Sequence, residues 1–258
     1  METVTSRDGA TIAFWRSGHG PPLLLVHGGL SDRTTWNLVR PAFEGRFTVY
    51  VVNRRGREGS GASREHELER EFEDVAAVMD AIVEPVHVVG HSGGALCALG
   101  ASLFSEQMRS LTLYEPPTPG AGTSGLAKEV REFVDAGNAD EAAATFLSKG
   151  PGLSAEEIER LKQSPIWPSI AALASSLPAE IGAIAGYQFK ASRFAGLECP
   201  ALLLLGGDSP ASIREVTYAL AKVWPNAQVR EMAGQRHMAN LAAPDLFVSE
   251  VLAFLDGV

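Results

Sequence analysis

The chain has 258 residues, of which 22 are Lys or Arg and 31 are Asp or Glu, so its formal net charge is −9. This acidic balance argues against nucleic acid as a partner, because binding to phosphates requires a basic surface. With 45% hydrophobic and 21% charged residues, the composition is that of a globular protein and excludes wholesale disorder.

The cysteines, the N-terminal residues and the lengths of the hydrophobic runs exclude several classes of protein. Cys97 and Cys199 are too few for a disulfide scaffold and lack the CxxC spacing of a metal site. The first residues, METVTSRDG, lack the basic start and apolar run of a secretory signal, and runs such as Leu202–Leu205 are too short to span a bilayer. Gly56–Gly61 does not have the G-x-G-x-x-G spacing of a dinucleotide site. We therefore expect a cytoplasmic protein with no membrane contact, no metal and no cofactor.

The first elements along the chain are strands. Thr3–Ser6 and Thr11–Trp15, separated by the turn signal Arg7-Asp8-Gly9, predict an N-terminal antiparallel hairpin. Later aliphatic runs are continuous rather than alternating, which is typical of strands that helices cover on both faces. These runs are Pro22–Val26, Phe47–Val52, Val86–Val89, Leu111–Tyr114 and Ala201–Leu205, with Ala227–Met232 as a candidate for the last strand.

Helical patterns lie between the strands. Apolar residues spaced 4, 3, 4, 3 from Leu68 to Ile82 predict an amphipathic helix, and similar patterns occupy 213–223 and 244–255. The alternation predicts an α/β fold with a mostly parallel, doubly wound sheet. An Ala-rich, helical stretch with a capping box at Ser154 interrupts this alternation of strands and helices. The chain then divides into a core, 1–118 and 195–258, and an inserted helical cap, 119–194.

One serine stands in the pattern of a nucleophile elbow. Gly90-His91-Ser92-Gly93-Gly94 follows the strand Val86–Val89 directly and precedes a helical stretch of small residues. G-x-S-x-G in this context is typical of a sharp turn that exposes a reactive hydroxyl, and the crowded backbone requires glycines beside it. Ser92 is the candidate nucleophile. The alternative is a glycine-rich turn with an incidental serine.

A serine hydroxyl needs a base that takes its proton and a carboxylate that orients the base. His237, in a loop after the last strand pattern, is the candidate base, and a surface imidazole is the alternative. Asp208 ends a buried strand and is the preferred acid, because Ser, Asp, His is the chain order of one class of serine hydrolases. Glu115 ends the strand before it and is the rival at the same edge of the sheet.

Main-chain donors complete the expected site. His27-Gly28-Gly29 ends the strand Pro22–Val26, and amides there could point at the same oxygen as the amide of Gly93. Removing one such donor costs about 3–4 kcal/mol of transition-state stabilisation in a studied hydrolase. The alternative is a simple turn that ends the strand.

These motifs make the chain resemble α/β-hydrolase-fold serine hydrolases of the compact bacterial esterase and non-haem haloperoxidase type, over nearly its full length. The residues that carry the resemblance are Arg7-Asp8-Gly9, His27-Gly28-Gly29, Trp36, Arg55-Gly56, Gly90–Gly94, Asp208 and His237. It implies that residues 119–194 form a cap that shapes the substrate pocket. It also implies a Ser92, His237 and Asp208 triad, with an oxyanion hole made by the amides of Gly29 and Gly93.

The sequence departs from the family pattern at two places. Gly206-Gly207-Asp208 is one residue tighter than the common Gly-x-x-Asp, and Asn53 replaces the usual Asp before the Arg-Gly turn. The first departure concerns the acid, and we expect the second to affect loop packing more than chemistry. Candidate pocket residues are Trp36, His91, Trp167 and Tyr187, with packing inside the protein as the alternative for the aromatic ones.

The function that these residues predict is hydrolysis of a small carboxylic ester, thioester or lactone through an acyl-enzyme on Ser92. The same three residues could instead carry out perhydrolysis, as in haloperoxidase-like relatives, or cleavage of a C–C bond or a cyanohydrin. A ligand-binding protein with an idle triad is the alternative from another class. The expected partner is a small-molecule substrate, and the oligomeric state stays open.

Overall fold

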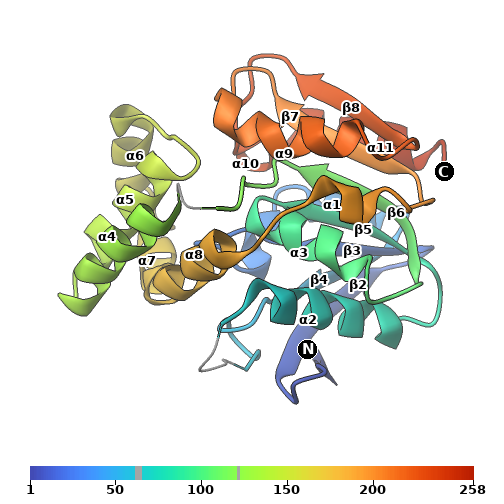
Figure 1. The fold of residues 1–258 in the computed structure, drawn as a ribbon, viewed down its shortest axis with the longest axis horizontal. Coiled ribbons are helices and arrows are strands. Elements are labelled where there is room, and N and C mark those ends of the chain that lie inside the picture. Colours follow the sequence, from blue (N-terminus) through green and yellow to red (C-terminus); the bar gives the residue numbers. More distant parts are fainter. Residues whose placement is uncertain (62–65, 121–122) are drawn as a thin grey trace.

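The computed structural model describes residues 1–61, 66–120 and 123–258. At its centre is one eight-stranded sheet with the strand order β1-β2-β4-β3-β5-β6-β7-β8 (Figure 1). The strands are β1 (Glu2–Thr5), β2 (Thr11–Gly18), β3 (Pro22–Val26), β4 (Thr48–Val52), β5 (Val86–His91), β6 (Met108–Tyr114), β7 (Ala201–Gly206) and β8 (Ala227–Met232). The hairpin β1–β2 and its pairing with β4 are antiparallel, and all other pairs are parallel. The predicted α/β-hydrolase sheet is confirmed.

Helices cover both faces of the sheet. The helices of this core are α1 (Arg40–Glu44), α2 (Leu68–Ala81), α3 (Gly93–Ala101), α9 (Ala211–Ala221), α10 (Ala239–Ala242) and α11 (Pro244–Leu255), with short 3-10 turns η1 (Arg33–Trp36) and η4 (Ala191–Phe194). Helices α2, α3 and α9 pack on one face, and α1 and α11 pack on the other. Leu24 and Val26 of β3 belong to the first layer, and Leu23 and Leu25 to the second. A strand buried on both faces has no reason to alternate apolar with polar residues, which explains its continuous aliphatic sequence.

A separate group of helices follows β6 and precedes β7. It consists of α4 (Ser124–Asp135), α5 (Ala139–Lys149), α6 (Ala155–Lys162), α7 (Trp167–Ala172), the 3-10 turn η3 (Leu173–Ser176) and α8 (Leu177–Gly186). These helices have an apolar cluster of their own and lie beside the sheet, on the left of Figure 1. The capping box at Ser154 is present, with Glu157 as its partner. Residues 121 and 122 of the expected cap lie outside the described residues.

The last residues assigned to the cap by sequence pack with the core instead. Tyr187 and Phe194 belong to the apolar layer of α2 and α3, and the Tyr187 ring meets that of Phe72 edge-on at 5.4 Å. The helical group therefore ends with α8, at Gly186. Aromatic residues after a helix can pack against either neighbour, and the sequence alone does not distinguish the two.

One stretch of this helical group is apolar enough to be compared with a membrane span. The stretch Trp167–Gly186, which contains α7, η3 and α8, is long and apolar enough to cross a membrane by length and composition alone. No other helical stretch in the described parts of the chain is. Its side chains Trp167, Leu177 and Ile181 are buried in the apolar cluster of the helical group. Packing inside the protein accounts for the apolar character of these three side chains.

Close contact between α2 and α3 yields a stability test. Gly100 lies under the ring of Phe72, and a Cβ at this position would overlap the ring. Although Ala favours a helix over Gly by about 1 kcal/mol, overpacking a tight core costs roughly 1–3 kcal/mol. We expect Gly100→Ala to lower the free energy of unfolding, as measured by urea denaturation.

The matched control is Gly182→Ala in α8, where nothing lies within 4 Å of the added Cβ. This exposed substitution should raise the free energy of unfolding by about 0.5–1 kcal/mol. A Gly100→Ala variant as stable as Gly182→Ala would contradict the tight packing of α2 on α3.

Candidate active site

The candidate residues gather where parallel strands end. Ser92 follows β5, Glu115 follows β6, Asp208 lies two residues after β7, and His237 lies in the loop after β8. The carboxyl ends of parallel strands meet at one edge of the sheet, where open α/β sheets bind ligands. This edge faces the helical group α4–α8, because residues of the core and residues of the helical group line the same cavity beside Ser92.

Backbone strain marks the same edge. Leu30, Ser92 and Glu115 have φ angles of 49°, 54° and 49°, and they are the non-glycine residues with positive φ in the described parts of the chain. Each follows the carboxyl end of a strand, β3, β5 or β6. Non-glycine residues persist in such conformations when the surroundings impose them, and they cluster at functional sites.

The elbow that holds Ser92 depends on its glycines. A Cβ at Gly94 would overlap the carbonyl oxygens of Val26 and His27, and a Cβ at Gly90 would lie 2.6 Å from the carbonyl oxygen of Gly94. Only glycine allows α3 to begin this close to β3 and β5. The predicted strand–turn–helix context of Ser92 is therefore present.

His237 is held by a buried carboxylate, that of Glu115. Its Nδ1 lies 2.7 Å from Glu115 Oε2, while Glu115 Oε1 accepts a hydrogen bond of 2.6 Å from the amide of Gly206. Glu115 is fully buried and His237 is 6% exposed. A carboxylate can only accept from Nδ1–H, so the neutral imidazole keeps its lone pair on Nε2. That is the tautomer that a general base needs.

The expected pairing of His237 with Asp208 is wrong. The side chain of Asp208 is exposed, and its main-chain N–H donates to the carbonyl of Gln235 at 2.9 Å. In the tight Gly206-Gly207-Asp208 turn, the amide of Gly206 instead supports the carboxylate of Glu115 from the neighbouring strand. The rival acid of the sequence analysis, Glu115, is therefore the one that the fold places against the imidazole.

Two further side chains fix the His237 loop. His91 Nε2 lies 2.8 Å from the carbonyl oxygen of His237, and the two rings are 4.7 Å apart. Burial lowers the pKa of His91 well below its usual value, so His91 is neutral and donates from Nε2. Tyr114 Oη donates to the carbonyl of Arg236 and accepts from the amide of Ala239 at 3.0 Å. Tyr114 thus bridges the loop on both sides of His237.

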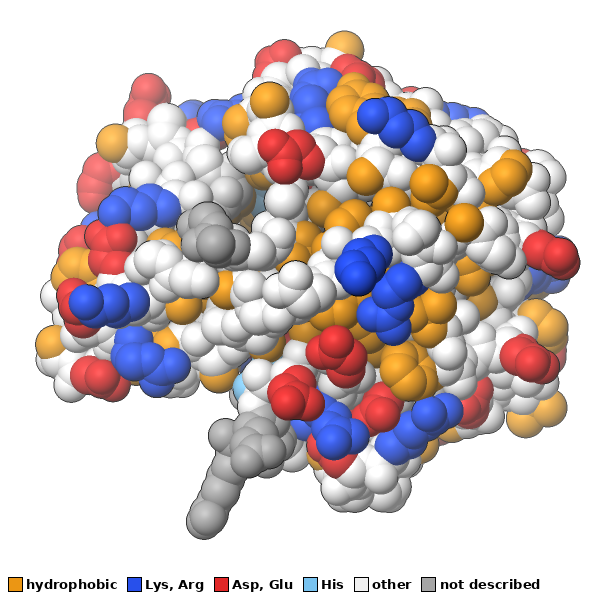
Figure 2. Space-filling view, in the orientation of Figure 1, with side chains coloured by type: hydrophobic (Ala, Val, Ile, Leu, Met, Phe, Trp, Pro, Cys, Tyr) orange, Lys and Arg blue, Asp and Glu red, His pale blue; other side chains and the backbone are white. Residues whose placement is uncertain are grey.

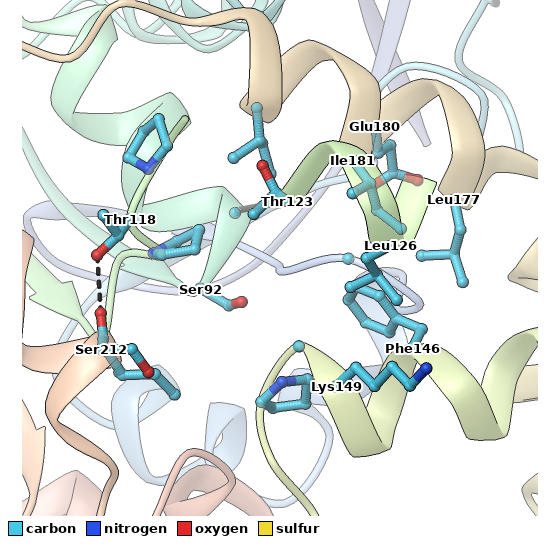
Figure 3. Close-up of a pocket in the computed structure, with 18 of the residues that line it drawn as sticks. Ser92, Thr118, Thr123, Leu126, Phe146, Lys149, Leu177, Glu180, Ile181 and Ser212 are labelled. Carbon is cyan, nitrogen blue, oxygen red and sulfur yellow. Dashed lines mark hydrogen bonds between the residues drawn. The ribbon is translucent and has the colours of Figure 1, made fainter. Parts of the chain in front are cut away.

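A cavity of about 490 Å³ opens over Ser92. Gly29, Gly93 and His237 line it on the core side. Apolar side chains line it on the side of the helical group, as Figure 3 shows for several of them, and these are Leu126, Phe146, Leu177, Ile181 and Ile184. The amide nitrogen of Gly29 lies 3.8 Å from the point where a Cβ of Gly93 would stand, so the two glycines face each other beside Ser92.

The four residues predicted to line the pocket do not line this cavity. Trp36 is buried with Phe247 under α11, and Trp167 is buried within the helical group. Tyr187 packs on Phe72, and His91 packs against the tilted ring of His237 and does not line the cavity. Aromatic residues have large apolar surfaces, and in this structure those surfaces are buried in the protein interior. The aliphatic residues of α4 and α8 that do line the cavity carry no sequence signal that separates them from core residues.

Sequence analysis also missed a group of buried charges at the wall of the cavity. Arg54 Nε and Nη2 donate to the carboxylate of Glu71 at 2.6 and 2.7 Å, and Arg57 Nη2 donates to Glu180 Oε1 at 2.6 Å. Burial opposes the ionisation of Glu71 and Glu180, but the arginines hold the pKa of both carboxyls below the usual value. Both are therefore ionised. The run Asn53-Arg-Arg-Gly56 is the available signal, but by itself it indicates only a turn.

Asn53, the second departure from the family pattern, has a packing role as expected. Its side chain is buried, accepts from the amide of Arg33 at 2.8 Å and donates to the carbonyl of Glu58 at 3.0 Å. Within residues 1–61, 66–120 and 123–258, no group of three or more His, Cys, Asp or Glu residues is arranged to hold a metal ion.

The strand order and the elbow serine at the carboxyl end of β5 are those of an α/β-hydrolase fold, with a helical group over the serine. The profile of the alpha/beta hydrolase family matches residues 23–250, and the chain belongs to this family. A solved structure of an alpha/beta hydrolase from Sphaerobacter thermophilus shares 33% identity with a TM-score of 0.84, covering 98% of this chain and 100% of that one.

Two curated relatives carry names that state an activity. The (E)-2-((N-methylformamido)methylene)succinate hydrolase of Acinetobacter baylyi is 25% identical over 263 residues, which cover 99% of this chain and 98% of that protein. The N-formylmaleamate deformylase of Pseudomonas putida is 30% identical over 122 residues, which are 46% of each chain.

The Tyr114 bridge predicts a measurable role in stability. Tyr114→Phe leaves the part-buried carbonyl of Arg236 and the buried amide of Ala239 without their partner, which costs about 1–3 kcal/mol. We expect urea denaturation to show a loss of this size. Tyr218→Phe is the control, since the Tyr218 hydroxyl bonds Glu231 at the surface, and it should change stability by less than about 0.5 kcal/mol. Equal effects of the two substitutions would contradict the bridge.

Proposed function

We propose that this protein is a serine hydrolase that cleaves small carboxylic esters, thioesters or lactones through an acyl-enzyme on Ser92. One observation carries the proposal: the imidazole of His237 is held by a buried Glu115 at the wall of the cavity that Ser92 also lines. Ser92 is the nucleophile, His237 the general base, and Glu115 the orienting acid in place of Asp208.

The proposed reaction has two halves. Ser92 Oγ attacks the carbonyl carbon while His237 Nε2 takes the hydroxyl proton. The amide N–H groups of Gly29 and Gly93 donate hydrogen bonds to the carbonyl oxygen and stabilise the negative charge that develops on it. The bond to the leaving group breaks as His237 returns the proton to it. A water molecule, deprotonated by His237, then attacks the acyl-enzyme and releases the acid and Ser92.

The lining of the cavity supports a small, mostly apolar acyl group. Aliphatic side chains and Phe146 face Ser92 across the space, which suits alkyl carbons more than extended polar chains. The hydrolase and deformylase relatives, by their names, act on small molecules, and transfer of an acyl group to water fits both names.

The proposal includes a cytoplasmic location and a small molecule as the partner. On the face shown in Figure 2, basic and acidic side chains are interspersed.

Covalent labelling tests the nucleophile. A fluorophosphonate probe should label the wild-type protein and leave Ser92→Ala unlabelled, because only an activated serine attacks the phosphorus. Mass spectrometry of the digested adduct should place the label on the peptide that contains Ser92. Absence of labelling in folded wild-type protein would instead support a ligand-binding protein with an idle triad.

Paired substitutions test the acid. Glu115→Gln should lower kcat for a reactive ester by on the order of 10⁴-fold, because an amide cannot hold the imidazole in the required tautomer. Asp208→Asn, at an exposed carboxylate, should change kcat by less than about threefold. Circular dichroism and urea denaturation of both variants control for folding. The opposite order of effects would show that Asp208 is the acid.

A further inference from the structure

Two buried atoms beside the proposed oxyanion hole form an ion pair with each other but make no hydrogen bond. They are Arg54 Nη1 and Glu180 Oε2, which lie 3.2 Å apart. Neither makes a hydrogen bond to any described residue, although both side chains are at most 4% exposed. The other polar atoms of these two side chains are bonded: Arg54 reaches Glu71, and Glu180 Oε1 accepts from Arg57 and Ser176. Buried polar atoms are rarely left in this condition without a reason.

The pair belongs to the wall of the cavity. Arg54 and Glu180 both line it, Arg54 from the core and Glu180 from α8 in the helical group. Nη1 lies 3.6 Å from the point where a Cβ of Gly93 would stand, and Oε2 lies 3.7 Å from the corresponding point of Gly29. Figure 3 shows Glu180 next to Ile181, across the cavity from Ser92. The two atoms therefore flank the two glycines whose amides would receive the carbonyl oxygen.

The charges of the four buried side chains determine which kind of ligand can bind beside them. Arg54 and Arg57 balance Glu71 and Glu180, so no positive charge is left over for an anion. A carboxylate at this place would be attracted by Arg54 and repelled by Glu180 at similar distances. A group that accepts from Nη1 and donates to Oε2 satisfies both atoms. A hydroxyl does this with one oxygen.

We propose that the cavity takes acyl groups that carry a hydroxyl near the scissile carbonyl, and that this hydroxyl, from the cavity side of the pair, accepts from Arg54 Nη1 and donates to Glu180 Oε2. The proposal rests on the proposed function, since the carbonyl held by Gly29 and Gly93 sets how far the hydroxyl can lie. Because the Arg54–Glu180 pair flanks these glycines, the hydroxyl that reaches it lies on the second or third carbon of the acid. Phe146 lies against Gly29 and Ile184 lies against Gly93, and a change of their side-chain rotamers would make room for the ligand.

A matched series of esters tests this specificity. The wild-type enzyme is assayed with ethyl esters of butanoate, 3-hydroxybutanoate and 3-methoxybutanoate, which differ only in the substituent on carbon 3. Monoethyl succinate is added as a fourth ester, in which a carboxylate replaces the terminal methyl group of butanoate. We expect kcat/KM for the 3-hydroxy ester to exceed that of the other three by at least about tenfold. The methoxy group accepts but cannot donate, and the succinate carboxylate meets Glu180. Equal values for the hydroxy and unsubstituted esters would overturn the proposal and leave only water at the pair.

A conservative substitution links the preference to the pair. Glu180→Gln keeps the shape but removes the charge, so the 3-hydroxy preference should fall below about threefold while the relative rate with monoethyl succinate rises. Glu141→Gln is the control, since that carboxylate pairs with Lys162 at the surface and does not line the cavity, and it should keep the wild-type ratios. Wild-type ratios in folded Glu180→Gln would overturn the assignment.

Binding without turnover separates this proposal from the proposed function. Calorimetry with Ser92→Ala and the same esters should show about tenfold tighter binding of the 3-hydroxy ester, whether or not Ser92 is the nucleophile. Failure of fluorophosphonate labelling with retained selectivity in binding would reject the serine mechanism alone. Hydrolysis of all four esters with equal affinities would reject the hydroxyl site alone.

Discussion

The hydrogen bond between His237 Nδ1 and Glu115 Oε2 is the interaction on which the site depends. It joins the loop after β8 to the end of β6, although β7 lies between these strands. The amide of Glu115 donates to Leu204 of β7, and Glu115 Oε1 accepts from Gly206 of the same strand. A shift of β7 by one residue would remove both supports. The parallel register of three strands therefore sets the orientation of one imidazole.

The opposite wall of the cavity is fixed by buried charges rather than by apolar packing alone. Glu180 lies on α8, and Arg54 and Arg57 follow β4 in the core, so their ion pairs attach the helical group to the sheet. Removing one member of such a network leaves an uncompensated buried charge, which costs roughly 3–5 kcal/mol. The same pairs place polar atoms beside Gly29 and Gly93. Attachment of the helical group and the polarity of the cavity thus have one structural origin.

Much of the fold and part of the site could be predicted from the sequence. Continuous aliphatic runs such as Pro22–Val26 indicate buried strands, and the glycines around Ser92 indicate the elbow, because both are local requirements of the backbone. The acid could not be assigned this way. Chain order favours Asp208, but whether a side chain at a strand end points toward His237 depends on the neighbouring strand. The cavity lining and the Arg54–Glu180 pair depend on how α8 docks, which no local pattern encodes.

The most direct test is a crystal structure of the protein after reaction with a fluorophosphonate, in which the phosphonyl oxygen stands for the oxyanion. The structure should show phosphorus bonded to Ser92 Oγ and the phosphonyl oxygen within about 3 Å of the amides of Gly29 and Gly93. The imidazole of His237 should remain bonded through Nδ1 to Glu115. An adduct in which His237 turns to Asp208, or in which the phosphonyl oxygen faces away from both amides, would contradict this account of the site.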